Sequence, residues 1–237
     1  MAHLSTSQRL HESLGAIIAE TKQGERLPSE PQLARRLGVS RATLREAMRT
    51  FETQGLIRRK QGSGTYVVHP SSVIESGLEV LESIETMAER IGLPASMGEL
   101  KIDHRSPSKE EAQILKCTDA KVVDLSRVIL AGARPAAYLI DIVPDDVITP
   151  ADLNSHFTGS VLDLLLKRGF PSLMTSRCEI NAVTASPEVA RALGIQRGDV
   201  LLRFVSFLYS TTGRVVDYSF SYFLPGYFRF HVVRRVG

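Results

Sequence analysis

The fold of this chain is decided by residues 27–67, which read LPSEPQLARRLGVSRATLREAMRTFETQGLIRRKQGSGTYV. Ser29 can cap the free N–H groups at the start of a helix, and Gln32 can reach back to it in a capping box. This helix should end before Gly38, which supplies a left-handed stop, and Ser40 can then cap another helix. A short helix, a tight glycine turn and a second helix are typical of a helix-turn-helix.

The second helix, which we expect over residues 41–54, has an apolar face and a basic face. The apolar residues recur at helical spacing and should pack inward; they are Leu44, Ala47, Met48 and Phe51. The opposite face is polar and basic; it carries Arg41, Thr43, Arg45 and Arg49. A guanidinium near the start of such a helix can bind guanine O6 and N7 in the major groove, which predicts DNA recognition. The alternative is a solvated basic face with no partner.

Further elements are expected on both sides of this helix pair. Upstream, an apolar stripe predicts a first helix that Gly24 ends; the stripe consists of Leu10, Leu14, Ile17 and Ile18. Downstream, residues 56–60 and 65–68 predict two strands joined by Gln61-Gly62-Ser63-Gly64. A basic hairpin with glycines at its tip can press its backbone against a phosphate or enter the minor groove. Residues 1–69 are therefore interpreted as a winged helix-turn-helix domain.

Positive charge is concentrated in this domain. Residues 1–69 hold 11 Lys and Arg against 6 Asp and Glu, a net charge of 11 − 6 = +5. The rest of the chain holds 29 − 11 = 18 basic and 26 − 6 = 20 acidic residues, a net charge of −2. A polyanion should thus bind the first domain. A non-specific architectural protein, the second alternative, would need a far more basic chain and no further domain.

Composition and motifs limit the remaining classes. The 237 residues are 43% hydrophobic and 23% charged, which suits a soluble globular protein. No apolar run approaches the ~20 residues that span a bilayer, and the N-terminus has no basic-then-apolar leader, so we expect a cytoplasmic protein without a membrane partner. Cys117 and Cys178 lack neighbours at metal spacing and should be free thiols. We expect no metal, no cofactor and no catalytic constellation.

The second part of the chain is predicted to be an α+β domain over residues 78–237, after a linker at residues 70–77. A helix is expected first, ending at Gly92; its stripe is Val80, Ile84, Met87 and Ile91. Strand-like runs follow at residues 100–104, 121–130, 136–143, 176–184, 200–209 and 215–223. Short helices are expected at residues 109–115, 161–167 and 188–193.

This second domain contains an internal repeat. Ser106-Pro107, a helix and a β-hairpin recur from Ser186-Pro187 onward, at an offset of 186 − 106 = 80 positions. Two related halves that share a sheet commonly leave a cleft between them, which is a natural ligand site. A duplicated core without a pocket is the alternative.

Residues 27–67 closely resemble the GntR family of winged helix-turn-helix regulators, with every glycine turn in register. The resemblance implies that Arg41 and Arg45 contact guanines, and that Ser40 and Thr43 contact phosphate or thymine. It places Gly62 at the tip of the wing. The other candidate DNA-binding residues are Ser29, Arg35, Arg49 and Gln61. Pro31 stands where the family usually carries an arginine that touches DNA, and Arg35 can replace it in part.

Residues 75–235 resemble the UTRA domain, the ligand-sensing domain of the HutC-like GntR branch, which is related in fold to chorismate lyase. The resemblance implies that an effector touches Arg127, Ser160 and Asp217, with Phe228 at a position that is often Tyr. Leu139 and Ile129 replace a frequent Glu and a frequent Arg; they leave fewer charges, which favours a less polar ligand than an amino-sugar phosphate.

These observations predict a transcriptional regulator. Two chains would pair through their second domains and place two recognition helices on operator half-sites about one DNA turn apart. A small-molecule effector would modulate operator affinity, and the resemblance implies a repressor. The alternative is a lyase-like enzyme in which Arg127 and Asp217 flank a carboxylate substrate and DNA binding is secondary.

Overall fold

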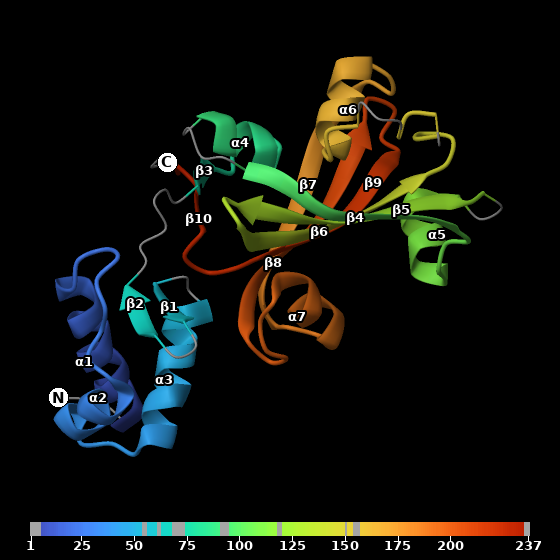
Figure 1. Ribbon diagram of the computed structural model, residues 1–237. Helices are drawn as coiled ribbons and strands as arrows, with labels where there is room; N and C mark the ends of the chain where they lie inside the picture. Colours follow the sequence, from blue (N-terminus) through green and yellow to red (C-terminus); the bar gives the residue numbers. More distant parts are fainter. Residues whose placement is uncertain are drawn as a thin grey trace. The chain divides into compact units, whose positions relative to one another are not determined.

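The computed structural model describes residues 6–53, 56–60, 63–67, 74–90, 95–117, 120–149, 151–153 and 157–234. The chain divides into two compact units. The first comprises Met1–Val73 with Pro225–Tyr227, and the second comprises Ile74–Leu224 with Phe228–Gly237. Figure 1 labels the helices and strands of both units.

The first unit contains three helices and a short hairpin. Its elements are α1 (Thr6–Glu20), α2 (Glu30–Leu37), α3 (Arg41–Thr53), β1 (Ile57–Lys60) and β2 (Gly64–Val67). The apolar stripes predicted for α1 and α3 meet in one core, in which Leu14, Leu44 and Met48 are fully buried. The predicted helix-turn-helix is confirmed. Burial of these stripes, at roughly 25 cal/mol per Å² of apolar surface, holds the three helices together.

The capping signals read from the sequence are also confirmed. The Gln32 Oε1 atom accepts hydrogen bonds from the Ser29 N–H at 3.0 Å and from the Ser29 hydroxyl at 2.7 Å. Gly38 ends α2 with φ +66°, a conformation in which a Cβ would be strained. The Ser40 hydroxyl accepts a hydrogen bond from the Thr43 N–H at 3.1 Å and so caps α3.

The hairpin pairs β1 with β2 antiparallel, from Ile57 opposite Val67 to Lys60 opposite Gly64. A third extended segment, which the sequence analysis missed, lies beside β2. The Leu27 N–H donates to the Thr65 carbonyl at 2.8 Å, and α1 accordingly ends at Glu20, before Gly24. The predicted tip residues Gln61 and Gly62 lie outside the described residues, as do residues 54–55 and 68–73.

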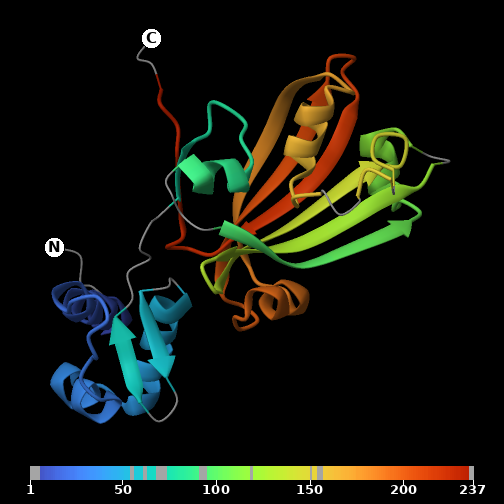
Figure 2. The same cartoon turned by 45° about the horizontal axis from the view of Figure 1, so that its top comes forward.

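The second unit is built on a six-stranded antiparallel sheet in the order β4-β5-β6-β9-β8-β7 (Figure 2). Its strands are β4 (Ala95–Arg105), β5 (Val122–Ala131), β6 (Arg134–Pro144), β7 (Leu173–Thr184), β8 (Val200–Ser210) and β9 (Val215–Phe223). The helices are α4 (Ile84–Arg90), α5 (Lys109–Leu115), α6 (Val161–Arg168) and α7 (Pro187–Leu193). Helices α4 and α6 lie on one face of the sheet, and α5 and α7 lie on the other.

The predicted internal repeat is present, with a corrected register. Each half runs strand, helix, strand, strand, and the halves join where β6 pairs with β9. The Ser108 hydroxyl caps α5 and the Ser186 hydroxyl caps α7, through the N–H groups of Glu111 and Val189. The equivalent serines are thus Ser108 and Ser186, an offset of 186 − 108 = 78, because the capping position and not the Ser-Pro pair fixes the start of each helix.

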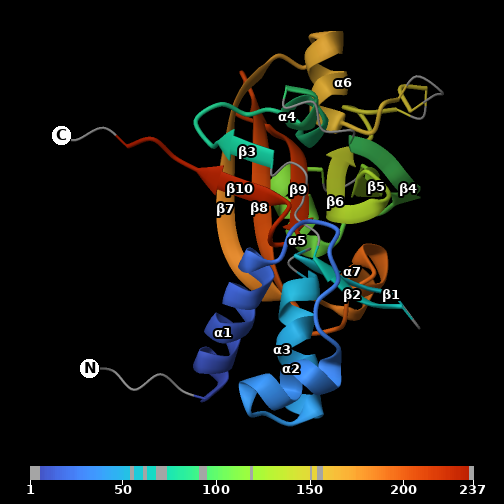
Figure 3. The same ribbon diagram turned by 60° about the vertical axis from the view of Figure 1, so that its left-hand side comes forward.

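Three expectations for the second unit are corrected. The helix predicted to include Val80 begins only at Ile84, because the Ser83 hydroxyl accepts a hydrogen bond from the Thr86 N–H at 3.0 Å and sets its start. Strand β4 begins at Ala95, well before the predicted residue 100. Strands β3 (Ile74–Gly77) and β10 (Phe228–His231), which were not predicted, pair in parallel (Figure 3). Residues 91–94 lie outside the described residues.

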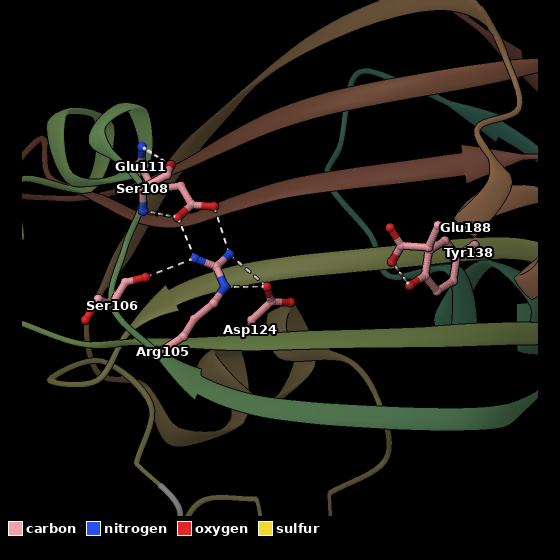
Figure 4. A network of polar contacts seen from close by, with 7 residues as sticks. All are labelled: Arg105, Ser106, Ser108, Glu111, Asp124, Tyr138 and Glu188. Carbon is pink, nitrogen blue, oxygen red and sulfur yellow. Dashed lines mark hydrogen bonds and ion pairs between the residues drawn. The ribbon is translucent and has the colours of Figure 1, made fainter.

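Ion pairs and hydrogen bonds fix the α5/α7 face of the sheet (Figure 4). The Arg105 guanidinium donates to both carboxylate oxygens of Glu111, at 2.7 and 2.8 Å, and its Nε donates to the Asp124 Oδ2 at 2.9 Å. It thereby ties α5 to β4 and β5. On the same face, the Tyr138 hydroxyl donates to the Glu188 Oε1 at 3.2 Å and ties α7 to β6. A cavity lies on the opposite face of the sheet, which carries α4 and α6.

Candidate functional sites

The basic face of α3 is exposed. Arg41, Thr43 and Arg45 are all exposed, and the Arg45 side chain is 61% accessible. Their exposure follows from the inward packing of Leu44 and Met48 on the other side of the same helix. Arg49 is half-buried, with its Nη2 at 3.2 Å from the Glu46 Oε1. The exposed guanidinium groups of Arg41 and Arg45 are of the kind that meets base edges or phosphates.

The other predicted DNA-binding residues have structural roles as well. Ser29 and Ser40 are exposed caps of α2 and α3, and the Ser40 and Thr43 hydroxyls lie 2.8 Å apart in a hydrogen bond. The Arg35 Nε donates to the carbonyl of Pro31 at 3.2 Å while the side chain remains exposed. Gln61 and Gly62 lie outside the described residues.

Two residues that sequence analysis missed position Arg45. The Glu30 carboxylate on α2 lies 3.6 Å from the Arg45 Nε, and the Arg59 Nη2 on β1 donates to the Arg45 backbone carbonyl at 3.1 Å. Arg59 is itself held by Glu52, whose Oε2 lies 3.5 Å from its Nε. These contacts join three elements, so no periodicity within a single element signals them.

The wing carries exposed cations beyond the predicted set. Arg58 on β1 and Arg26 in the extended segment beside β2 are both exposed. Gly64 has φ +120°, and a Cβ there would lie 2.4 Å from the Arg26 Nε. The glycine therefore leaves room for the Arg26 guanidinium beside β2, a role for Gly64 that differs from the tip position expected of it.

A cavity of about 600 Å³ lies in the second unit, on the face of the sheet that carries α4 and α6. Arg127 on β5, Asp141 on β6 and Asp217 on β9 line it from three neighbouring strands. Serine residues add to its polar wall; among the described lining residues they are Ser83, Ser160, Ser176, Ser206, Ser219 and Ser221. Its size falls within the range of small-molecule sites, about 300–1,000 Å³.

The charged groups of this cavity are deeply buried. Arg127, Asp141 and Asp217 are 4%, 7% and 6% exposed, and Arg127 forms an ion pair with Asp141. The Arg127 Nε lies 4.0 Å from the Glu85 Oε1 on α4. Burial, and then the neighbouring Asp141, raise the pKa of Asp217 well above its ordinary value; Arg127 opposes this shift. Burial likewise raises the pKa of Glu85.

Several polar atoms here have no hydrogen-bond partner among the described residues. They are the Asp217 Oδ1, both carboxylate oxygens of Glu85 and the Arg127 Nε. A buried polar atom without a partner costs about 1–3 kcal/mol, and such atoms around a cavity indicate a ligand site.

The predicted effector residues separate into two groups. Arg127, Ser160 and Asp217 line the same cavity. Phe228 is not among the described lining residues; its ring packs 4.8 Å from the ring of Phe223 in a hydrophobic cluster, and Phe230 lines the cavity instead. Phe228 and Phe230 lie two residues apart and therefore on the same face of β10, with their ring centroids 5.8 Å apart, and Phe230 is the one that reaches the cavity.

The acidic character of the cavity was not predicted from the sequence. Among the described lining residues, one is basic and five are acidic; the acidic residues are Glu79, Glu82, Glu85, Asp141 and Asp217. Asp141 had a sequence signal that was overlooked, a single carboxylate within the apolar run YLIDIV. Glu85 had none, because it lies beside the predicted apolar stripe of Ile84 and Met87 and not on it.

Within the described ranges, no cluster of three or more His, Cys, Asp and Glu is arranged to hold a metal ion, and no helix there has the length and apolar character to cross a bilayer. Cys117 is buried and Cys178 is exposed, and both are free thiols, as predicted.

Comparison with known proteins covers both units. Residues 6–67 match the family described as bacterial regulatory proteins, gntR family, and residues 92–229 match the UTRA domain. The HTH-type transcriptional repressor NagR of Bacillus subtilis is 31% identical over 198 residues, which cover 81% of this chain and 79% of that protein. The histidine utilization repressor of Pseudomonas putida is 28% identical over 180 residues, 75% of this chain and 70% of that protein.

A similar fold is found in the crystal structure of PhnF from Mycobacterium smegmatis. The two chains superpose with a TM-score of 0.66 at 18% identity, over 96% of this chain and 100% of that one.

Proposed function

This chain belongs to the GntR family of bacterial regulatory proteins and is a HutC-type regulator with a UTRA domain, and we propose that Arg41 and Arg45 of α3 read its operator. A DNA-binding transcriptional repressor whose operator affinity responds to an effector is the function shared by such regulators. The observation that carries the residue assignment is the exposed basic face of α3, whose Arg45 is held from two sides by Glu30 and Arg59.

Positioning of Arg45 supports base recognition. Arg59 fixes the Arg45 backbone through its carbonyl, and the Arg45 guanidinium stays exposed beside Glu30, where a guanine edge can reach it. The contact between Arg45 and Glu30 is weak, at 3.6 Å and in solvent, so DNA can displace it at little cost. The exposed Arg26 and Arg58 of the wing supply phosphate contacts beside it.

We assign the cavity lined by Arg127, Ser160 and Asp217 to effector binding, without catalysis. The relatives named above are described as repressors, and the unpartnered buried polar atoms are suited to holding a ligand. Two copies of the chain pair in the cytoplasm through their second units, so that two α3 helices meet operator half-sites about one DNA turn apart. The effector binds one arrangement of the dimer more tightly than the other and thereby shifts operator affinity.

The assignment is tested by operator binding. The operator is selected from random duplexes with the wild-type protein, and affinity is measured by fluorescence anisotropy for wild type, Arg45→Ala and Arg197→Ala. Arg197 is an exposed arginine of the second unit and controls for loss of one positive charge. R45A should lose about 10-fold or more in operator affinity while R197A stays unchanged. Equal affinities for all three proteins would refute the assignment.

A further inference from the structure

The charge of the cavity bears on the class of its ligand. Its described lining holds five carboxyl groups against the one guanidinium of Arg127, and it holds no lysine or histidine. A site that selects phosphate or carboxylate groups concentrates arginine and lysine donors. The excess of acidic groups here favours a ligand of the opposite charge.

Arg127 offers little positive charge to an anion. Its guanidinium forms an ion pair with the buried Asp141, and its Nε lies 4.0 Å from Glu85. An anionic ligand would have to compete with both carboxylates for this one cation, in a setting where burial strengthens electrostatic interactions. It would also approach the buried carboxyl group of Asp217, which offers no positive charge to pair with it.

Asp217 is a buried acid with an unsatisfied oxygen. It is 6% exposed, it lines the cavity, and its Oδ1 has no hydrogen-bond partner among the described residues. Among the described residues, neither carboxylate oxygen of Glu85, on the opposing helix α4, has a hydrogen-bond partner. No described cluster has the geometry for a metal ion, so an organic donor is the better match.

The remainder of the wall is apolar and aromatic. Phe204, Phe223 and Phe230 line the cavity, and their rings pack on one another with centroids 4.6 to 5.0 Å apart. Met87 and Leu139 continue this surface. The cavity thus joins an acidic end to an aromatic wall, which suits a ligand with a cationic head and an apolar body.

We propose that the cavity binds an organic cation, an amidinium, guanidinium or ammonium head group, whose N–H donors pair with Asp217 and Glu85 while its apolar part lies against Phe204 and Phe230. This inference rests on the proposal that the cavity is the effector site. Pairing supplies hydrogen bonds to the unpartnered oxygens and places a positive charge among buried carboxylates.

The test uses three isosteric probes that differ in charge: benzamidine, benzamide and benzoate. Their dissociation constants for the full-length wild-type protein are measured by calorimetry at neutral pH. Benzamidine should bind at least about 10-fold more tightly than benzamide, and benzoate should bind most weakly. The inference is overturned if benzoate or benzamide equals benzamidine, or if none of the three binds at millimolar concentration.

Variants locate the effect in the cavity. Asp217→Asn keeps the shape of the side chain but removes its charge, and should reduce benzamidine affinity about 10-fold or more while leaving benzamide affinity nearly unchanged. Glu85→Gln should weaken benzamidine binding in the same direction. Glu99→Gln removes a carboxylate that does not line this cavity and serves as the matched control. Unchanged benzamidine affinity in both cavity variants would also overturn the inference.

Failure of this inference can be distinguished from failure of the proposed function. Operator affinity is measured on the same wild-type and R45A samples. If the probe ranking fails while R45A still loses the operator, only the ligand class is wrong. If R45A retains the operator, the DNA-reading assignment fails whatever the probes do.

Discussion

The basic face of α3 and the acidic cavity of the second unit both concentrate charge, but in opposite environments. The Arg45 side chain is 61% exposed and meets its carboxylate partner at 3.6 Å in solvent, whereas the Arg127 side chain is 5% exposed and is paired with a buried Asp141. Exposed charge costs the fold little and remains available to a large polyanion. Buried charge is costly unless it is paired. A ligand that binds in the cavity can supply the hydrogen bonds that the unpaired polar atoms lack.

The largest expected effect on stability comes from the buried charges of the cavity. Arg127→Ala removes the cation from among Asp141, Glu85 and Asp217 and leaves Asp141 buried without its partner. The second unit should lose about 3–5 kcal/mol of unfolding free energy, as expected when one member of a buried ion pair is deleted. Urea unfolding followed by circular dichroism measures it, with Arg197→Ala as the exposed control. A loss below about 1 kcal/mol would mean that solvent screens the cavity charges.

A smaller effect is expected at the start of α3. Ser40→Ala removes the hydroxyl that accepts the Thr43 N–H and should cost about 1 kcal/mol of stability. Ser40→Asn keeps an acceptor at the capping position and should retain most of that stability. Thermal unfolding compares the two variants. If they are equally unstable, Ser40 acts through something other than the cap; if S40N is stable but loses operator affinity, the serine hydroxyl itself contacts DNA.

Asp217→Asn should stabilise the free protein, and increasingly so as pH rises. Because the pKa of Asp217 is raised in the folded state, the fold holds a proton that the unfolded chain releases above about its ordinary pKa of 3.8. Stability of the wild type therefore falls as pH rises through the window above that value, and an uncharged asparagine removes this loss. Melting temperatures of D217N and wild type from pH 4 to pH 8 should diverge in favour of the variant. A constant difference across this range would contradict a raised pKa.

Sequence alone could predict the first region well and the second only in part. The exposure of Arg41 and Arg45 follows from the periodicity of one helix, and the turns around it follow from glycines and capping residues. The cavity draws side chains from β5, β6, β9 and α4, so its acidic character emerges only when the strands are placed in register. Phe228 and Phe230 illustrate the limit, since both lie on one face of β10 and local alternation cannot tell that only Phe230 reaches the cavity.

The start of α4 and the strands β3 and β10 were not predicted correctly because contacts between distant residues fix them. Val80 fits the apolar spacing of α4, but the hydroxyl of Ser83 starts the helix later, and it also donates to the Asp163 Oδ2 at 2.7 Å on α6. This contact between residues 80 positions apart outweighs the local pattern. Similarly, β3 and β10 are too short and too far apart in sequence to be predicted as a pair.

The smallest expected stability effect returns to the exposed side. Arg45→Ala breaks a solvent-exposed contact with Glu30 and should change unfolding free energy by less than about 0.5 kcal/mol, even though operator affinity falls sharply. Chemical denaturation of the same samples used for DNA binding measures it. A loss of 2 kcal/mol or more would mean that Arg45 stabilises the fold and would contradict its description as an exposed charge available to DNA.

The most direct measurement of the central claim is a double-substitution cycle between Arg45 and the operator. Each operator guanine is replaced in turn by 7-deazaguanine, which lacks the N7 acceptor, and affinities are measured for wild type and R45A. Replacement of one particular guanine should weaken wild-type binding by about 1 kcal/mol or more. The same replacement should have no effect on R45A, because that variant already lacks the hydrogen bond to N7. If every such replacement weakens R45A as much as wild type, Arg45 does not read a guanine and the account of α3 is wrong.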